Sequence, residues 1–221
     1  MPVASPTNPA STPSPRPLTA RGQRTRAKLV KAARRTFERR GYLDTSIQDI
    51  SAAARVAYGT FYTYFASKEE IFAEVVDDLS ADLRAIADAE PAAGPDPASR
   101  IARTTRGYLR AYQANAPMMA ILEQVATFSP RLGEVRRAAR RTRVEASRAA
   151  IARWQARGLV RADVDPAYAA TALGSMVDRS AYVWFVLGEP FDEERAIEQL
   201  TLLYCTALGL EPPPKEDPCR R

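Results

Sequence analysis

The sequence predicts an all-α protein with two domains, and three observations support this prediction. Apolar residues recur at intervals of three and four along most of the chain, which places them on one face of a helix. Ser, Asp, Gly and Pro stand at the ends of these runs, where helices start and stop. No stretch shows the alternation of apolar and polar residues that is typical of a strand. We therefore expect an N-terminal three-helix domain followed by a larger helical domain.

Residues 1–20 predict a disordered leader. Six of the first 17 residues are Pro, interspersed with Ser and Thr, and such a composition does not bury a core. The leader lacks the apolar segment of a secretion signal, and the longest purely apolar run, residues 181–187, is far shorter than the ~20 residues of a membrane span. Two cysteines, Cys205 and Cys219, do not make a disulfide framework. These features predict a cytoplasmic protein that does not enter a membrane.

Residues 21–66 predict a helix-turn-helix domain. One helix is expected over residues 46–54, with Thr45 as its N-cap, because its apolar positions share one face. Only three residues separate it from a second helical run, in which Phe61 and Phe65 are four residues apart and face one way. A linker this short forces the two helices into a helix-turn-helix corner.

The second helix of this corner offers a surface suited to base edges in a DNA major groove. Gly59, Thr60, Tyr62 and Thr63 lie off the buried Phe stripe, and small residues near a helix start allow close approach. Residues 1–65 hold 11 Lys and Arg against 3 Asp and Glu, a net charge of +8, whereas the remaining residues have a net charge of −2. Because phosphate neutralisation provides most of the sequence-independent affinity for DNA, this asymmetry predicts DNA binding by the N-terminal domain.

The segment from Thr25 to Phe72 resembles the N-terminal domain of the tetracycline-repressor (TetR) family of bacterial regulators. The matching motifs are AA-x-x-x-F at residues 32–37, GY at 41–42, T-S-I-x-D-I at 45–50, GTFY at 59–62 and YF-x-SKEE at 64–70. The resemblance implies a DNA-binding domain that reads a double-stranded operator. It also implies a two-fold dimer in which the last two long helices form a four-helix bundle, and a second domain that binds an inducer.

Four positions depart from the family pattern. Arg55 stands where the family usually has Gly, Ala57 where a Ser caps the recognition helix, Tyr58 where Lys is frequent and Thr63 where His is frequent. The missing Ser cap is typically worth about 1 kcal/mol. The candidate DNA-binding residues, which lie on this corner or beside a helix start, are Arg26, Thr45, Arg55, Tyr58, Gly59, Thr60, Tyr62, Thr63 and Lys68. Four further basic residues fit either phosphate contacts or a solvated helix face: Arg34, Arg35, Arg39 and Arg40.

Residues 67–210 predict a second, larger helical domain for ligand binding and dimerisation. Ser67 to Glu70 has the pattern of a capping box that starts a helix over residues 68–89, and a Pro-rich linker follows at 91–97. Further helices are expected at 98–115, after Pro117, at 131–157 with Gly158 as C-cap, from Asp165-Pro166 to 187, and at 192–208. Residues 211–221 predict a disordered tail.

The last two helices are apolar over so wide an arc that they require burial on more than one side. Intramolecular packing would satisfy this requirement, but a head that reads two half-sites of a pseudo-palindrome favours a homodimer. Met and aromatic residues on the middle helices fit either ordinary core or an adaptable pocket for a small hydrophobic effector. The pocket candidates are Tyr108, Tyr112, Met118, Met119, Leu122, Phe128, Trp154, Met176, Tyr182 and Phe185. The shared face of Arg136, Arg140 and Arg143 fits either solvent or an anionic ligand such as an acyl thioester.

The absence of histidine excludes Ser-His-Asp and Cys-His triads and HExxH zinc sites. Phosphate-binding glycine loops and metal-site cysteine spacings are also absent, so we expect neither enzyme activity nor a metal or cofactor. Residues 192–194 are acidic, but they suit a helix start better than catalysis. The sequence therefore predicts a homodimeric transcriptional repressor that a small hydrophobic ligand releases from its operator. The alternatives are an activator or a ligand-independent regulator and, more remotely, a helical enzyme or a protein-interaction module.

Overall fold

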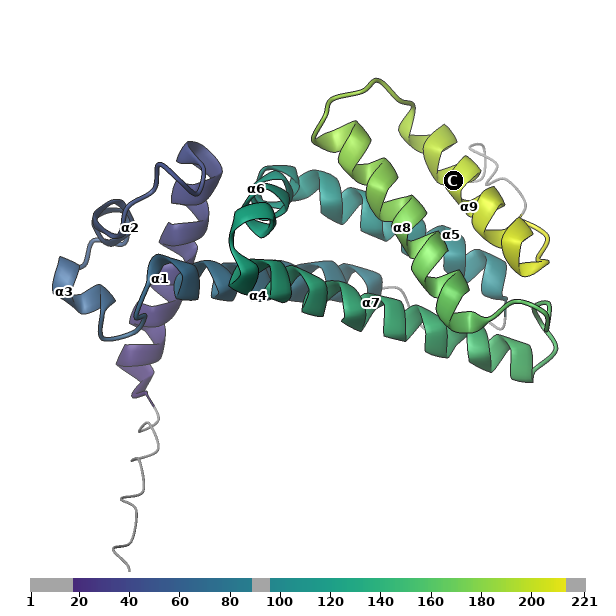
Figure 1. Ribbon diagram of the computed structural model, residues 1–221, viewed down its shortest axis with the longest axis horizontal. Helices are drawn as coiled ribbons and strands as arrows, with labels where there is room; N and C mark the ends of the chain where they lie inside the picture. Colours follow the sequence, from purple (N-terminus) through teal and green to yellow (C-terminus); the bar gives the residue numbers. More distant parts are fainter. Residues whose placement is uncertain (1–17, 89–95, 214–221) are drawn as a thin grey trace, which may run out of the picture.

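The computed structural model describes residues 18–88 and 96–213, and this part of the chain is helical apart from its connections (Figure 1). Its nine helices are α1 (Ala20–Arg40), α2 (Ile47–Ala53), α3 (Tyr58–Phe61), α4 (Lys68–Asp88), α5 (Pro97–Ala114), α6 (Ala116–Phe128), α7 (Pro130–Ala156), α8 (Pro166–Phe185) and α9 (Glu193–Leu208). The all-α prediction is confirmed. Residues 1–17, 89–95 and 214–221, which hold most of the predicted leader, linker and tail, lie outside the described residues.

Helices α1 to α3 and the first turns of α4 form a head at one end of the molecule (Figure 1). Its core is aromatic: Phe37 of α1, Phe61 of α3 and Phe72 of α4 are fully buried, and Phe65 is nearly so. The rings of Phe37 and Phe72 meet edge to face with their centroids 5.2 Å apart. The predicted buried face of the second helix is therefore correct, and it fixes which side of α3 remains for solvent.

The N-cap of α2 is Ser46, so the prediction of Thr45 was wrong. Ser46 Oγ accepts a hydrogen bond from the Asp49 N–H at 3.1 Å, and Asp49 Oδ2 accepts one from the Ser46 N–H at 2.9 Å. This capping box satisfies two backbone donors. Thr45 is 2% exposed, and its hydroxyl donates to the carbonyl of Gly41 at 2.7 Å.

Helix α4 connects the head to the rest of the molecule, because its first turns pack on α1 while α5 and α7 pack along it. Its start follows the predicted Ser67 to Glu70 pattern in part. Ser67 Oγ accepts from the Glu70 N–H at 3.1 Å, but the Glu70 carboxylate accepts from the Ala66 N–H at 2.6 Å rather than from that of Ser67. The helix nevertheless begins where the pattern places it.

Local capping sets the bounds of the later helices. Asp96, Asp165 and Asp192 each accept hydrogen bonds from backbone N–H groups in the first turns of α5, α8 and α9. At the end of α7, Gly158 adopts φ 67°, and the next N–H donates to the carbonyl of Trp154 at 2.9 Å. This is a Schellman ending with glycine in the left-handed position. The predicted bounds of α5, α7, α8 and α9 agree with the structure to within two residues.

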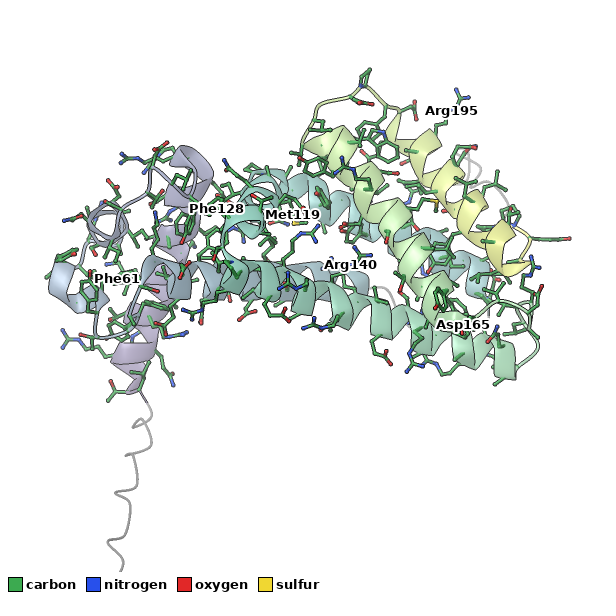
Figure 2. All side chains as sticks on the ribbon, in the orientation of Figure 1. Phe61, Met119, Phe128, Arg140, Asp165 and Arg195 are labelled. Atoms are coloured by element: carbon green, nitrogen blue, oxygen red, sulfur yellow. The ribbon has the colours of Figure 1, made fainter. Side chains whose placement is uncertain are left out.

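Helices α4 to α9 form the body of the molecule, in which α8 packs on α7 and α9 packs on α5 (Figure 1). The side chains of Met119 and Phe128 lie where the body meets the head, and Asp165 lies at the far end (Figure 2). Phe128 is half-exposed, and its ring centroid is 6.3 Å from that of Tyr42 in the head. Over the described ranges, no helix is long and apolar enough to cross a membrane.

Candidate nucleic-acid interface and cavity

The corner between α2 and α3 depends on an unusual backbone conformation at Arg55. This residue has φ 52°, in the left-handed region that favours glycine, and it is the only non-glycine residue with a positive φ among those described. Ala57 then occupies the N-cap position of α3 and makes no side-chain capping bond, as predicted. The helix comprises only residues 58–61. It is followed by hydrogen-bonded turns, in which the Thr63 N–H donates to the carbonyl of Thr60 and the Phe65 N–H donates to the carbonyl of Phe61.

The solvent side of α3 and of the turn after it presents small and hydroxylated residues. Gly59 and Thr63 are exposed, Tyr58 and Tyr62 are 46% and 49% exposed, and Thr60 is half-buried. The hydroxyls of Tyr58 and Tyr62 lie 2.9 Å apart, and their rings meet edge to face with centroids at 5.4 Å. The five α3-region candidates thus lie along α3 and the turn that follows it, with the two tyrosines in contact.

Lys68, the first residue of α4, is engaged within the head. Its Nζ donates to the carbonyls of Tyr42 and Thr45, each at 2.8 Å, and lies 4.4 Å from the centroid of the Tyr42 ring. Burial lowers the pKa of Lys68. The ammonium therefore fastens the loop between α1 and α2 to the start of α4, a role that the sequence prediction of a phosphate contact did not include. Thr45, with its buried hydroxyl, likewise offers no free side-chain group to a phosphate.

Three basic residues of the head form internal ion pairs. Arg26 makes a two-pronged pair with Glu74 of α4, and its guanidinium stacks 4.9 Å from the Phe65 ring centroid. Arg40 pairs with Asp49 at 2.6 Å. Arg34 donates to Glu38 and Asp82, and also to the side-chain oxygen of Asn115 at the junction of α5 and α6. Arg34 therefore joins the head to the body, and Arg26 fastens α1 to α4 within the head. Arg35 and Arg39 are exposed on α1 and remain candidates for phosphate contacts.

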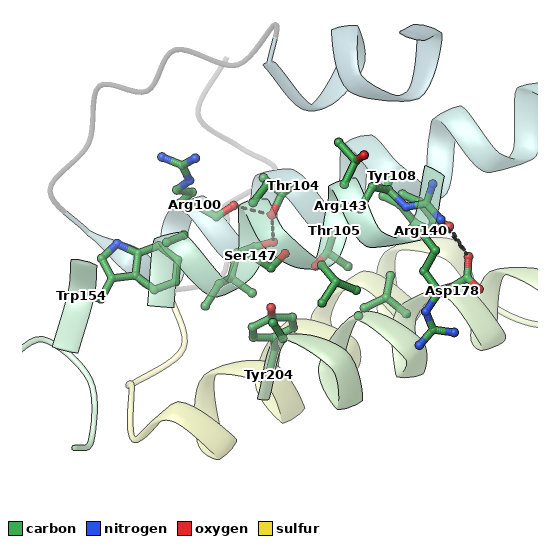
Figure 3. Close-up of a pocket in the computed structure, with 18 residues that line it drawn as sticks. Arg100, Thr104, Thr105, Tyr108, Arg140, Arg143, Ser147, Trp154, Asp178 and Tyr204 are labelled. Carbon is green, nitrogen blue, oxygen red and sulfur yellow. Dashed lines mark hydrogen bonds and ion pairs between the residues drawn. The ribbon is translucent and has the colours of Figure 1, made fainter. Parts of the chain in front are cut away.

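A cavity of about 340 Å³ lies in the body between α5, α7, α8 and α9 (Figure 3). Its apolar lining includes Ile101, Val144 and Val177, and its polar lining includes hydroxyl groups and several charged side chains. The Tyr108 hydroxyl donates to Asp178 Oδ1 at one end. Burial, together with the negative charge of Asp178, raises the pKa of Tyr108 well above its ordinary value. The volume lies within the range of sites for small organic molecules.

Only Tyr108 and Trp154 of the ten predicted pocket residues line this cavity. Tyr112, Met118, Met119 and Leu122 are buried in the main core and do not line this cavity. The other four, which are packed against that core or exposed elsewhere, are Phe128, Met176, Tyr182 and Phe185. Helical periodicity identifies an inward face but does not distinguish a filled core from an empty one, because that depends on how four helices fit together.

The polar part of the lining, which includes Thr104, Thr105, Ser147 and Asp178, was not predicted from the sequence. A signal was present, since hydroxyl and carboxyl groups on inward faces of helices require partners or water. The basic face of α7 divides into two parts. Arg140 and Arg143 line the cavity, whereas Arg136 is half-buried and donates to Glu123 at 2.7 Å.

Comparisons with known proteins agree with this architecture. Residues 29–75 match the family model described as bacterial regulatory proteins, tetR family. The chain is similar to the HTH-type transcriptional regulator YdgC of Bacillus subtilis, with 37% identity over 67 residues, or 30% of this chain and 34% of the relative. It is also similar to the HTH-type transcriptional repressor DhaR of a Mycobacterium species, with 41% identity over 59 residues, or 27% of this chain and 30% of the relative. The chain thus spans about a third of the length of the curated relatives that it matches.

The likeness in three dimensions extends over most of the chain. The TetR family transcriptional regulator PfmR of Thermus thermophilus superposes with a TM-score of 0.62 and 27% identity, covering 82% of this chain and 97% of that protein. The similarity in sequence is concentrated in the head, and the similarity in fold includes the body.

Proposed function

We propose that this chain, a protein of the TetR family, is a homodimeric transcriptional repressor that binds operator DNA and releases it when a small molecule occupies the body cavity. The observation that carries the proposal is the exposed edge of α3 on a folded helix-turn-helix head. Tyr58, Gly59, Tyr62 and Thr63 project from a rigid aromatic core, in the most basic part of the chain.

The α3 edge suits a major groove in shape and chemistry. Gly59 offers close backbone approach, and the Thr and Tyr hydroxyls donate and accept hydrogen bonds with base edges or phosphates. Exposed basic residues on α1, such as Arg35 and Arg39, supply charge for the phosphate backbone. Arg55, at the tight corner before α3, is exposed and adds a further positive charge beside the edge.

A second copy of the chain would cover an exposed stripe on α8. Ala172, Met176, Ser180 and Val183 recur at intervals of three and four on α8, and Leu187 follows the end of the helix; each is exposed or partly exposed. On the neighbouring α9, Leu202 and Leu203 are 38% and 53% exposed. Contiguous apolar surface of this kind marks an association site, and a two-fold axis would bring α8 and α9 of both copies into one bundle. Such a dimer presents two heads to two half-sites.

Ligand control requires that the effector bind more tightly to the arrangement of heads that does not fit the operator. The cavity is bounded by α5, and the end of α5 reaches the head through Asn115 and its contact with Arg34. Helix α4 provides a second connection through the Arg26 to Glu74 pair. A shift of α5 on ligand binding therefore has a direct path to α1. The alternative to a repressor is an activator, and the position of the operator relative to the promoter distinguishes these two functions.

The test is binding of the full chain to genomic DNA recovered by footprinting, compared with random duplex of equal length. If each protomer neutralises about four phosphates, log K should fall against log salt with a dimer slope near −7. Thr63→Val should weaken operator binding more than random-duplex binding, because it removes a base-reading hydroxyl. Thr127→Val, on an exposed threonine of α6, is the matched control. Equal losses on both DNAs would remove Thr63 from base readout, and salt-independent binding would contradict the proposal as a whole.

A further inference from the structure

The cavity contains more positive than negative charge. Three arginines line it, Arg100, Arg140 and Arg143, against a single carboxylate, that of Asp178. Arg143 Nη2 lies 3.9 Å from Asp178 Oδ1, and the same carboxylate accepts the hydrogen bond of the Tyr108 hydroxyl. The negative charge of Asp178 is therefore already engaged by Arg143 and Tyr108, so it does not neutralise the other arginines.

Arg140 has a neutral partner. Its Nη2 donates to Ser175 Oγ at 2.5 Å, and that hydroxyl in turn donates to the carbonyl of Thr171. Among residues 18–88 and 96–213, no carboxylate lies within ion-pair distance of Arg140. Its neighbours on α7 differ, because Arg136 pairs with Glu123 while Arg137 and Arg141 pair with Glu134. A half-buried guanidinium beside apolar surface is stabilised when an anion joins it.

The rest of the lining fits an apolar body attached to that anion. From the Arg140 end toward Trp154 at the opposite end, the cavity passes the side chains of Thr105, Ser147 and Tyr204 (Figure 3). Its wall includes the apolar side chains Ile101, Val144, Ala150, Ala170 and Val177. Arg140 has no carboxylate partner among the described residues, and the planar fork of its guanidinium matches the two oxygens of a carboxylate.

We propose that the effector of this protein is an organic carboxylate with an apolar body, its carboxylate held by Arg140 and its body lying toward Trp154. The regulatory consequence rests on the proposed function, but the binding itself does not. Because Arg140 is charged whether or not ligand is present, the carboxylate should bind better than an uncharged analogue of the same shape. A cationic analogue should bind worst, since it meets the arginines.

The experiment uses decanoate, decan-1-ol and decyltrimethylammonium as three probes of one chain length and different charge. The full chain carrying Trp184→Phe leaves Trp154 as its single tryptophan, so fluorescence quenching reports occupancy of the cavity. Decanoate should bind more tightly than decan-1-ol, and the cation should not compete with it. Arg140→Gln should weaken the binding of decanoate by about tenfold to a hundredfold, the range for loss of a charged hydrogen bond, and leave the affinity for decan-1-ol unchanged. The decanoate affinity of Arg140→Lys should lie between those of the wild type and Arg140→Gln, because lysine keeps the positive charge but lacks the planar fork of the guanidinium.

Arg148→Gln is the control, since Arg148 is an exposed arginine of the same helix that pairs with Glu145 outside the cavity. Thermal melting of each variant verifies that it is folded. Equal affinity for decanoate and decan-1-ol, no binding of decanoate, or equal losses in Arg140→Gln and Arg148→Gln would each overturn the inference. Arg140-dependent binding that leaves operator affinity unchanged would uphold the carboxylate site and contradict the ligand control in the proposed function.

Discussion

Replacing Lys68 by Met separates a structural role of this lysine from a role in binding phosphate. The ammonium makes two hydrogen bonds of 2.8 Å to the carbonyls of Tyr42 and Thr45 and lies 4.4 Å from the Tyr42 ring centroid. Met keeps the length and apolar stem of the side chain but removes the charge and all three donors. The loop between α1 and α2 then loses its attachment to the start of α4.

The expected loss is about 2 kcal/mol. Each charged hydrogen bond typically contributes about 1.5–3 kcal/mol, and a partly exposed cation over an aromatic ring about 0.5–1 kcal/mol. The desolvation that lowers the pKa of Lys68 opposes these gains, and its partial exposure reduces them further. For a chain of this length, a loss of 2 kcal/mol corresponds to a fall in melting temperature of roughly 4–8 °C.

The assay combines thermal melting with the salt dependence of binding to a random duplex. If Lys68 is structural, the melting temperature falls, while the slope of log K against log salt stays the same. If Lys68 contacts a phosphate on each protomer, the slope becomes shallower by about 0.9 per lost contact. Lys31→Met, at an exposed lysine of α1, is the control for charge alone. A Lys68→Met protein with the melting temperature of the wild type and a shallower slope of log K against log salt would refute the structural role of Lys68.

Three further substitutions test the local structure of the head. Arg55→Gly should raise the free energy of unfolding by up to about 1 kcal/mol, because relief of the left-handed strain at φ 52° exceeds the entropy that glycine loses on folding. A lower midpoint in urea unfolding would contradict this expectation. Ala57→Ser should add the missing N-cap of α3 and about 1 kcal/mol, whereas Ala57→Val should not, so equal midpoints for these two variants would count against a capping effect. Ser51 Oγ is buried with no hydrogen-bond partner in the described structure, so Ser51→Ala should unfold at the same or a higher urea concentration, and a loss above about 1 kcal/mol would reveal a partner.

The helices and the fold class of this protein were predictable because their signals are local. Asp165 and Asp192 accept hydrogen bonds from N–H groups two or three residues away, and Gly158 ends α7 by its own backbone conformation. Such contacts form whatever the rest of the chain does. The same holds for the buried Phe61 and Phe65 stripe, which leaves the opposite side of α3 exposed. The choice of Thr45 over Ser46 as N-cap was an error of local interpretation, since the acidic partner of Ser46 stands in the sequence three residues on.

The roles of individual charged side chains were decided by the tertiary structure. Lys68 reaches carbonyls 23 and 26 residues earlier in the chain, and Arg26 reaches a carboxylate 48 residues later. Spacing along a helix indicates which way these side chains point, but the partners that they meet come from other helices. The sequence made a basic residue at a helix start a reasonable candidate for a phosphate contact. The tertiary structure instead supplies acceptors within the protein for Lys68 and Arg26.

The cavity is the clearest case of a feature that the sequence left open. Met119 and Tyr112 have the same apolar, inward character as Trp154, yet the first two are packed core and the third lines an empty space. Dense packing is the default inside a protein, and a void arises only where the surfaces of several helices fail to meet. The sequence by itself predicted the helices of the described residues, a basic head and an exposed side of α3, because each depends on neighbours within a few residues. Only the packing of α5, α7, α8 and α9 decided where the cavity lies and left Arg140 on its wall without a carboxylate partner among the described residues.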